Sequence, residues 1–267
     1  MNLETGAKNT WCPGCGHFSI LAAAKQAINE IIEEGTKPEN IVIASGIGCH
    51  AKIVDYVNVN SFYSIHGRVP PTLTGMKLAN PELIPIGFAG DGDGYGEGLA
   101  HLIFAAKRNV NITMIMHNNR IYGLTTGQFS PTTPKGMKTK STPEGSLEYP
   151  FNPIRLMIAA GATFVARCSS SDIKHLKETI KEAVKHKGFS IIDVVEPCMS
   201  FFNSTSYLRE NVYKMEDHDP TNKIEALKRA DEWNYTAEGR IPIGIFYKVE
   251  KPTYDELVLR GRNPRKN

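Results

Sequence analysis

The sequence has no long hydrophobic run and little excess of either charge. Its apolar stretches stay well below the roughly 18 residues of a membrane-spanning helix, and Met1 to Thr10 is polar. We therefore expect neither a membrane anchor nor an export signal, and we predict a cytoplasmic protein. The chain has 31 Lys and Arg against 28 Asp and Glu, a net charge of +3. Nucleic-acid-binding proteins carry a much denser positive charge, so a nucleic-acid partner is not expected.

Cysteine is also scarce, and its count is odd. The five cysteines of a chain without an export signal do not predict a disulfide framework. Cys12 and Cys15 form a Cys-x-x-Cys pair, which in the cytosol indicates a metal, a cluster or redox chemistry. With 41% hydrophobic and 22% charged residues, the 267-residue chain has the composition of a globular protein with a large core.

Short, nearly continuous apolar runs recur along the chain and indicate buried strands. They occupy residues 41–45, 61–65, 83–89, 112–117, 163–168 and 190–196. Segments with helical spacing occur at 17–34, 97–109, 153–161 and 171–187. Buried strands that alternate with helices predict an α/β fold, a parallel sheet with helices on both faces. In such sheets ligands bind at the loops that leave the carboxyl ends of the strands.

The remaining segments are less regular. Residues 119–152 contain scattered Gly and Pro and no clear period, which is typical of an active-site cover or of a disordered segment. Residues 201–240 are polar and weakly patterned, before a strand-like run at 241–247 and a helix-like run at 252–259. We expect a cofactor-binding domain over 1–200 and a C-terminal extension over 201–267 that packs on this domain or on a partner.

A glycine-rich loop follows the run at 83–89 and reads Gly-Asp-Gly-Asp-Gly-Tyr-Gly-Glu-Gly from Gly90 to Gly98. Glycines let the backbone approach a ligand, and amides at a helix start favour phosphate. The loop does not fit the dinucleotide or P-loop patterns. A carboxylate beside a diphosphate needs a bridging cation, so Asp91 is a candidate Mg²⁺ ligand. The alternative is a glycine-rich turn with a solvated carboxylate.

The next strand ends at His117-Asn118-Asn119-Arg120-Ile121. Neighbouring strand ends can share one metal, so Asn119 could add a side-chain oxygen and Ile121 a backbone carbonyl. Gly-Asp-Gly followed one strand later by Asn-Asn is the pattern of thiamine diphosphate enzymes.

Four cysteines are predicted to lie near this loop. Cys49 follows the strand at 41–45 and Cys198 follows the strand at 190–196, and the Cys12/Cys15 pair precedes the first helix. Four thiolates could hold zinc or a [4Fe–4S] cluster. Because the last two cysteines are isolated rather than a second pair, the spacing favours iron–sulfur. Cys168 lies inside an apolar strand and is expected to be a small buried residue.

Taken together, these motifs resemble the β subunit of the two-subunit 2-oxoacid:ferredoxin oxidoreductases. The resemblance covers approximately residues 11–200 through WCPGCG, SGIGC, the His66-Gly67-Arg68 triplet, GDGDG, NNRIYGLTTGQFSPT and the cysteine after Glu-Pro. It implies a thiamine-type α/β fold and Mg²⁺ on Asp91, Asn119 and Ile121. It also implies a [4Fe–4S] cluster and a set of cofactor contacts. The cluster ligands would be Cys12, Cys15, Cys49 and Cys198. The cofactor contacts would be Ile47, Gly48, Cys49, His50, His66, Gly67, Arg68, Gly92, Asp93 and Leu124.

The same resemblance implies a reaction and partners. A 2-oxoacid would lose CO₂, coenzyme A would take up the acyl group, and ferredoxin would receive the electrons. The chain leaves little room for a pyrimidine-binding domain, which the family places on an α subunit, and one cluster would pass electrons directly to ferredoxin. His50 departs from the family, in which a small residue commonly follows the cluster cysteine.

Two rival functions and several residue roles remain open in the sequence. A non-redox thiamine decarboxylase or synthase would leave the four cysteines without a role, and a zinc-stabilised binding module would leave the Mg²⁺ motif without one. Lys52, one turn beyond Cys49, is a candidate for binding the substrate carboxylate. Arg68 and His66 are the other candidate catalytic residues. Basic residues near 135–140 and 260–266 are solvated surface or a docking site for an acidic ferredoxin.

Overall fold

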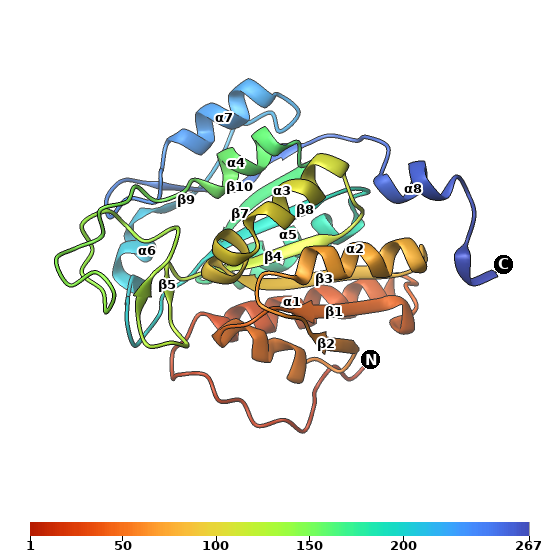
Figure 1. The fold of residues 1–267 in the computed structure, drawn as a ribbon, viewed down its shortest axis with the longest axis horizontal. Coiled ribbons are helices and arrows are strands. Elements are labelled where there is room, and N and C mark those ends of the chain that lie inside the picture. Colours follow the sequence, from red (N-terminus) through yellow and green to blue (C-terminus); the bar gives the residue numbers. More distant parts are fainter. Residues whose placement is uncertain (267) are drawn as a thin grey trace.

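The computed structural model describes residues 1–266 and has the predicted α/β fold (Figure 1). Its main sheet has eight strands in the order β2-β1-β3-β4-β8-β7-β10-β9. Their bounds, in chain order, are β1 Ile41–Ser45, β2 Asn60–Tyr63, β3 Ile84–Gly90, β4 Thr113–Asn118, β7 Phe164–Ser169, β8 Ser190–Val195, β9 Val212–Lys214 and β10 Ile241–Lys248. All six apolar runs therefore correspond to parallel strands, whereas β10 pairs with β7 in the antiparallel sense.

Helices cover both faces of this sheet. Helices α1 (His17–Glu33) and α5 (Ile173–Lys185) pack on one face. Helices α2 (Val69–Ala79), α3 (Leu99–Arg108), α4 (Pro153–Ala160) and α7 (Lys223–Asp231) pack on the other. The spacing of Ile20, Ala24, Ala27 and Ile31 buries one side of α1 against the strands, as amphipathic spacing predicts. Within residues 1–266, every helix is too short or too polar to span a bilayer.

Short elements form the loops at the carboxyl ends of the central strands. They are η2 (Cys49–Asp55), the π-helical η3 (Gly92–Glu97), β5 (Ile121–Tyr122) and β6 (Gln128–Phe129), with η1 (Pro38–Asn40) and η4 (Pro264–Lys266) elsewhere. The β5–β6 hairpin gives the irregular segment 119–152 an ordered start, and it packs near the pocket described below. Figure 1 shows β5 and α6 (Thr205–Asn211) at one end of the molecule and α8 (Tyr254–Leu259) at the opposite end.

The C-terminal part of the chain joins the main sheet. Strands β10 and β9 extend it beyond β7, and α7 packs on the same face as α4 (Figure 1). A small separate core connects this region to the end of β8, through Val195, Leu208, Trp233, Tyr235 and Ile241. The C-terminal residues thus pack directly beside the strand ends where ligands are expected.

Candidate active site

Loops after β1, β2, β3 and β4 surround a pocket at the carboxyl edge of the sheet. Two neighbouring parallel strands, β3 and β4, end there with Asp91 and Asn119, as the sequence predicts. The predicted residues that line the pocket are Ile47, Gly48, Cys49, His50, His66, Asp91, Gly92, Asp93, Asn119, Ile121 and Leu124. Gly92 is required because a Cβ at this position would overlap the ring of Tyr122, another lining residue.

Asp93 holds three of these loops together. Its Oδ1 accepts hydrogen bonds from the backbone amides of Ile47, at 3.2 Å, and Gly67, at 2.7 Å. The same oxygen lies 2.7 Å from His66 Nδ1, and Oδ2 lies 3.5 Å from His50 Nε2. Hydrogen bonds and charge from His50 keep the pKa of Asp93 below its ordinary value although burial alone would raise it. Gly67 does not line the pocket, but its backbone amide donates to Asp93, which does.

Asp91 is buried with few partners. Thr132 Oγ1 lies 3.1 Å from Asp91 Oδ2 and 2.8 Å from Asn118 Oδ1, and its single hydrogen cannot serve both acceptors fully. Burial raises the pKa of Asp91 to about 7, against hydrogen bonds from Ser130 and Thr132 that lower it. A buried carboxylate with so little compensation fits a divalent cation, which would stabilise its charged form. The donor set of Asp91, Asn119 and the Ile121 carbonyl is all oxygen, as Mg²⁺ prefers.

A second cavity of about 190 Å³ contains the four predicted cluster cysteines. Cys12, Cys15, Cys49 and Cys198 all line it, and all are free thiols. Burial, and then the charge of Glu196, raises the pKa of Cys15 to about 12, and burial also raises the pKa of Cys49. Buried thiols such as Cys15 and Cys49 become thiolates beside strong positive charge, and a set of four sulfur donors fits a metal or an iron–sulfur cluster. Cys168 is buried within β7, as predicted.

The two cavities share a wall. His17, Cys49, Asn119, Gly123 and Leu124 line both of them. A Cβ on Gly123 would lie 3.7 Å from Cys198 Sγ and 3.8 Å from Cys49 Sγ, so the backbone after Asn119 runs beside the thiols. Trp11 Nε1 donates to the carbonyl of Cys49 at 2.6 Å and ties the Cys12/Cys15 segment to the pocket loop.

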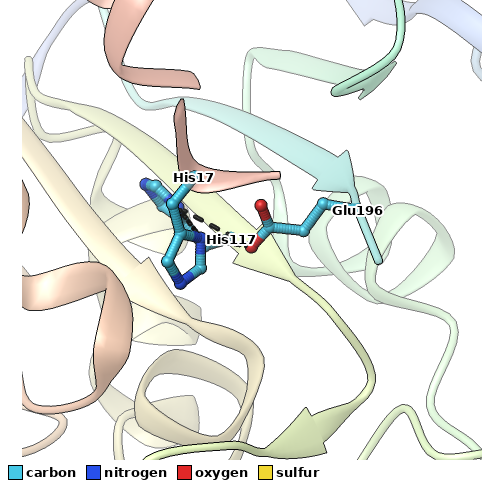
Figure 2. Close-up of side chains that lie close together, drawn as sticks. All are labelled: His17, His117 and Glu196. Atoms are coloured by element: carbon cyan, nitrogen blue, oxygen red, sulfur yellow. Dashed lines mark hydrogen bonds and ion pairs between the residues drawn. The ribbon is translucent and has the colours of Figure 1, made fainter. Parts of the chain in front are cut away.

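A buried group of three residues near this wall was not predicted from the sequence. Figure 2 shows His17, His117 and Glu196 converging from α1, β4 and the end of β8. His17 Nδ1 lies 2.7 Å from Glu196 Oε1 and 3.1 Å from His117 Nδ1. Burial, and then the nearby His17, keeps the pKa of His117 well below its ordinary value, so this imidazole is neutral. Each residue adjoins a recognised motif, but no sequence spacing relates the three to one another.

The predicted catalytic residues occupy different places. Lys52 lines the cysteine cavity, and its Nζ donates to Thr10 Oγ1 at 2.7 Å. His66 lines the first pocket beside Asp93. Arg68 is exposed outside the lining residues, where its guanidinium donates to the Glu97 carbonyl at 3.2 Å.

Comparisons with known proteins agree with this geometry. Residues 46–194 match the thiamine pyrophosphate enzyme C-terminal TPP binding domain, and residues 198–261 match the C-terminal family of the pyruvate ferredoxin oxidoreductase beta subunit. The chain is 44% identical to the beta subunit of 2-oxoacid:ferredoxin oxidoreductase 1 from Aeropyrum pernix, over 98% of this chain and 84% of that protein. The chain belongs to the β-subunit family of the 2-oxoacid:ferredoxin oxidoreductases.

Other members of this β-subunit family are similarly close. The beta subunit of 2-oxoacid:ferredoxin oxidoreductase from Saccharolobus solfataricus is 43% identical, over 96% of this chain and 87% of that protein. Among solved structures, 2-oxoglutarate:ferredoxin oxidoreductase from Magnetococcus marinus, with 2-oxoglutarate, coenzyme A and succinyl-CoA bound, matches with a TM-score of 0.92. Its sequence identity is 34%, over 99% of this chain and 90% of that one. The predicted family and fold are confirmed, and a redox enzyme is favoured over both rival functions.

Proposed function

We propose that this chain carries Mg²⁺–thiamine diphosphate and one [4Fe–4S] cluster, and that with an α subunit it oxidises a 2-oxoacid to an acyl-CoA and CO₂, with electrons passing to ferredoxin. The observation that carries the proposal is the wall shared by the two cavities. Asp91 lies on one side of this wall and the thiols of Cys12, Cys15 and Cys198 lie on the other, while Asn119 and Cys49 belong to the wall itself. Such proximity suits one-electron transfer out of a cofactor pocket.

The chain's own residues would bind and orient the cofactor. Asp91, Asn119 and the Ile121 carbonyl would hold Mg²⁺, and the backbone amides of the glycine-rich loop would face the diphosphate. Asp93 would keep the loops after β1 and β2 in position through Ile47 and Gly67. When bound, thiamine diphosphate would supply the carbanion that attacks the 2-oxo carbon and accepts the electrons left as CO₂ departs.

The cysteine side would carry electrons away. Cys12, Cys15, Cys49 and Cys198 would bind the cluster, and Cys12 is the most exposed of the four. The exposed thiol marks the side from which a ferredoxin could approach. Cytoplasmic location and ferredoxin docking by the basic segments stay predictions of the sequence.

We also propose that Lys52 binds the substrate carboxylate. Lys52 lines the cysteine cavity, which adjoins the cofactor pocket at Cys49 and Leu124. Its ammonium donates one hydrogen bond, to Thr10, and can donate others to a substrate carboxylate. His66 would contact the cofactor beside Asp93, and Arg68 would act from the pocket rim.

The test is a substrate panel on the co-purified αβ complex. Pyruvate, 2-oxoglutarate and branched-chain 2-oxoacids are each supplied with coenzyme A, and ferredoxin reduction is followed in wild type and Lys52→Ala. We expect CoA-dependent reduction with at least one substrate. Lys52→Ala should lower kcat/KM roughly 10- to 150-fold, as for loss of one charge-assisted hydrogen bond of ~1.5–3 kcal/mol. No CoA-dependent reduction with any 2-oxoacid would contradict the proposal, and an unchanged substrate ranking would remove Lys52 from the pocket.

A further inference from the structure

A buried carboxylate connects the C-terminal segment to the residue before Asn119. Asp193 on β8 accepts hydrogen bonds from Tyr95 Oη at 2.9 Å, Asn118 Nδ2 at 2.9 Å and Tyr235 Oη at 2.6 Å. Arg167 supports Tyr235 by donating to its hydroxyl from Nε, at 3.2 Å, and Nη2, at 3.1 Å. Every partner of Asp193 donates, so the amide of Asn118 is fixed with its NH₂ toward Asp193 and its Oδ1 toward Thr132.

The residue after Asn119 is held by the same C-terminal segment. Arg120 is 3% exposed, and its Nη1 donates to the carbonyls of Tyr235, at 3.4 Å, and Thr236, at 3.0 Å. Its guanidinium also lies over three aromatic rings of that segment. The centroid distances are 4.7 Å to Phe202, 5.7 Å to Tyr207 and 5.4 Å to Trp233. Such cation–π contacts are strongest where water is excluded.

The backbone conformation of Arg120 itself is unusual. Arg120 has a φ of +62°, a left-handed conformation that side chains other than glycine adopt at a cost. Strain of this kind persists only where surrounding contacts enforce it, and it is concentrated at functional sites. The contacts of Arg120 with the C-terminal segment supply that enforcement.

We propose that residues 202–236 act as a positioning clamp for Asn119, because they hold Arg120 directly and hold Asn118 through Asp193. The clamp consists of Tyr235 with the aromatic rings around Arg120. It explains why a segment outside the cofactor pocket packs so closely on the metal-binding loop. The inference rests on the proposed function, because Asn119 is assigned there as a Mg²⁺ ligand. None of the clamp residues would touch the metal, so they are positioning residues.

The test measures metal affinity without turnover. Mn²⁺ replaces Mg²⁺ in the oxidised αβ complex with thiamine diphosphate, and the electron paramagnetic resonance signal of free Mn²⁺ reports binding. Tyr235→Phe removes the hydroxyl between Arg167 and Asp193. Loss of a direct partner of a metal ligand typically weakens metal binding about 10- to 100-fold, and because Tyr235 acts through Asp193 we expect a loss at the low end, roughly tenfold. Iron content should stay at the wild-type value, because the cysteine cavity does not include Tyr235.

The matched control is Tyr213→Phe. This tyrosine lies in the same segment, and its hydroxyl donates to Glu232 away from the metal loop. Arg120→Lys is the second variant, which keeps the charge but loses the guanidinium geometry, and it should also weaken Mn²⁺ binding. If Tyr235→Phe fails to fold, the Mn²⁺ affinity of Arg120→Lys tests the clamp instead.

The outcomes separate the two proposals. Weaker Mn²⁺ binding in the clamp variants, with iron content and Tyr213→Phe unchanged, supports the clamp. Wild-type affinity in folded clamp variants overturns it while leaving the proposed function intact. Equal weakening in Tyr213→Phe also overturns it, because a general loss of stability would then suffice. A wild-type complex that does not bind Mn²⁺ with thiamine diphosphate overturns the metal assignment itself.

Discussion

Asp91 and Asp93 are two residues apart, yet their surroundings differ sharply. Asp93 Oδ1 accepts from two backbone amides and lies beside the His66 imidazole, while Oδ2 lies 3.5 Å from His50 Nε2 without a hydrogen bond among residues 1–266. Asp91 is held by the hydroxyls of Ser130 and Thr132 and by its own backbone amide, and burial raises its pKa to about 7. The sequence predicted Asp91 as a metal ligand from its motif, but the different role of Asp93 depends on loops that are distant in sequence. The structure alone reveals that difference.

The first prediction concerns Asp91→Ala. Without this carboxylate the metal would lose its charged ligand, so Mg²⁺-dependent binding of thiamine diphosphate should fall by more than the roughly 100-fold that loss of an outer-shell partner costs. Isothermal titration calorimetry with Mg²⁺ and cofactor measures it, and Asp217→Ala at an exposed position is the control. Iron content should not change. Cofactor binding at wild-type affinity would contradict the metal assignment.

The second prediction distinguishes the cysteines. Cys198→Ser should lose most of the bound iron, because Cys198 lies in the shared thiol cavity. Cys168→Ser should keep it, because Cys168 is buried in β7 outside that cavity. Iron and sulfide analysis of anaerobically purified protein is the measurement. Full iron content in Cys198→Ser would move the fourth ligand elsewhere.

Among the helices and strands, the sequence predicted the buried parallel strands but not helices α2 and α7 or the direction of β10. Runs such as 112–117 are almost wholly apolar because both faces of the central strands are covered. Helix α2 was missed because its first turn contains Pro70 and Pro71, which are tolerated there but indicate a loop by composition. Helix α7 was missed because only Ala226 and Ala230 are buried, too few for a clear period. The antiparallel direction of β10 depends on tertiary pairing that no local pattern encodes.

The third prediction concerns the pairing of α1 with α5. Glu30 forms ion pairs with Lys177 and Lys181, whose hydrogen bonds lower its pKa from 4.5 to about 2. Because the folded-state pKa is lowered, this stabilisation is complete above pH ~4.5 and is lost as the pH falls toward 2. Glu30→Gln should therefore lower the free energy of unfolding modestly at pH 7, and less so at lower pH or at high salt.

Denaturant unfolding of wild type and Glu30→Gln between pH 7 and pH 3 measures this difference. Glu33→Gln, on the same helix, is the control, because Glu33 forms no ion pair with the residues 1–266 that the structure describes. A stability difference that is the same at every pH would show that Glu30 acts through packing rather than charge.

At the scale of the whole molecule, the pocket is open to a partner. Ile47, Ile65 and Leu124 are 42%, 76% and 50% exposed, and Ile47 and Leu124 line the pocket itself. Large apolar side chains at the mouth of a binding site are typical of a surface that is buried against another protein chain. Membership of a β-subunit family implies an α partner, but these exposed residues are visible only in the fold.

The fourth prediction is that the isolated chain is inactive. It would supply the metal and diphosphate side of the proposed site, while the α subunit would supply the group that activates the aminopyrimidine. We expect 2-oxoacid-dependent reduction of an electron acceptor only after the α subunit is added. Turnover by the isolated chain, freed of α subunit, would contradict the two-subunit account.

The most direct test of the central claim is anomalous diffraction from anaerobically grown crystals of the αβ complex, measured on both sides of the iron absorption edge. Our account predicts one iron cluster bound by Cys12, Cys15, Cys49 and Cys198, across the Gly123 wall from cofactor density beside Asp91. A signal that appears at the zinc edge instead, or iron bound at other residues, would contradict it.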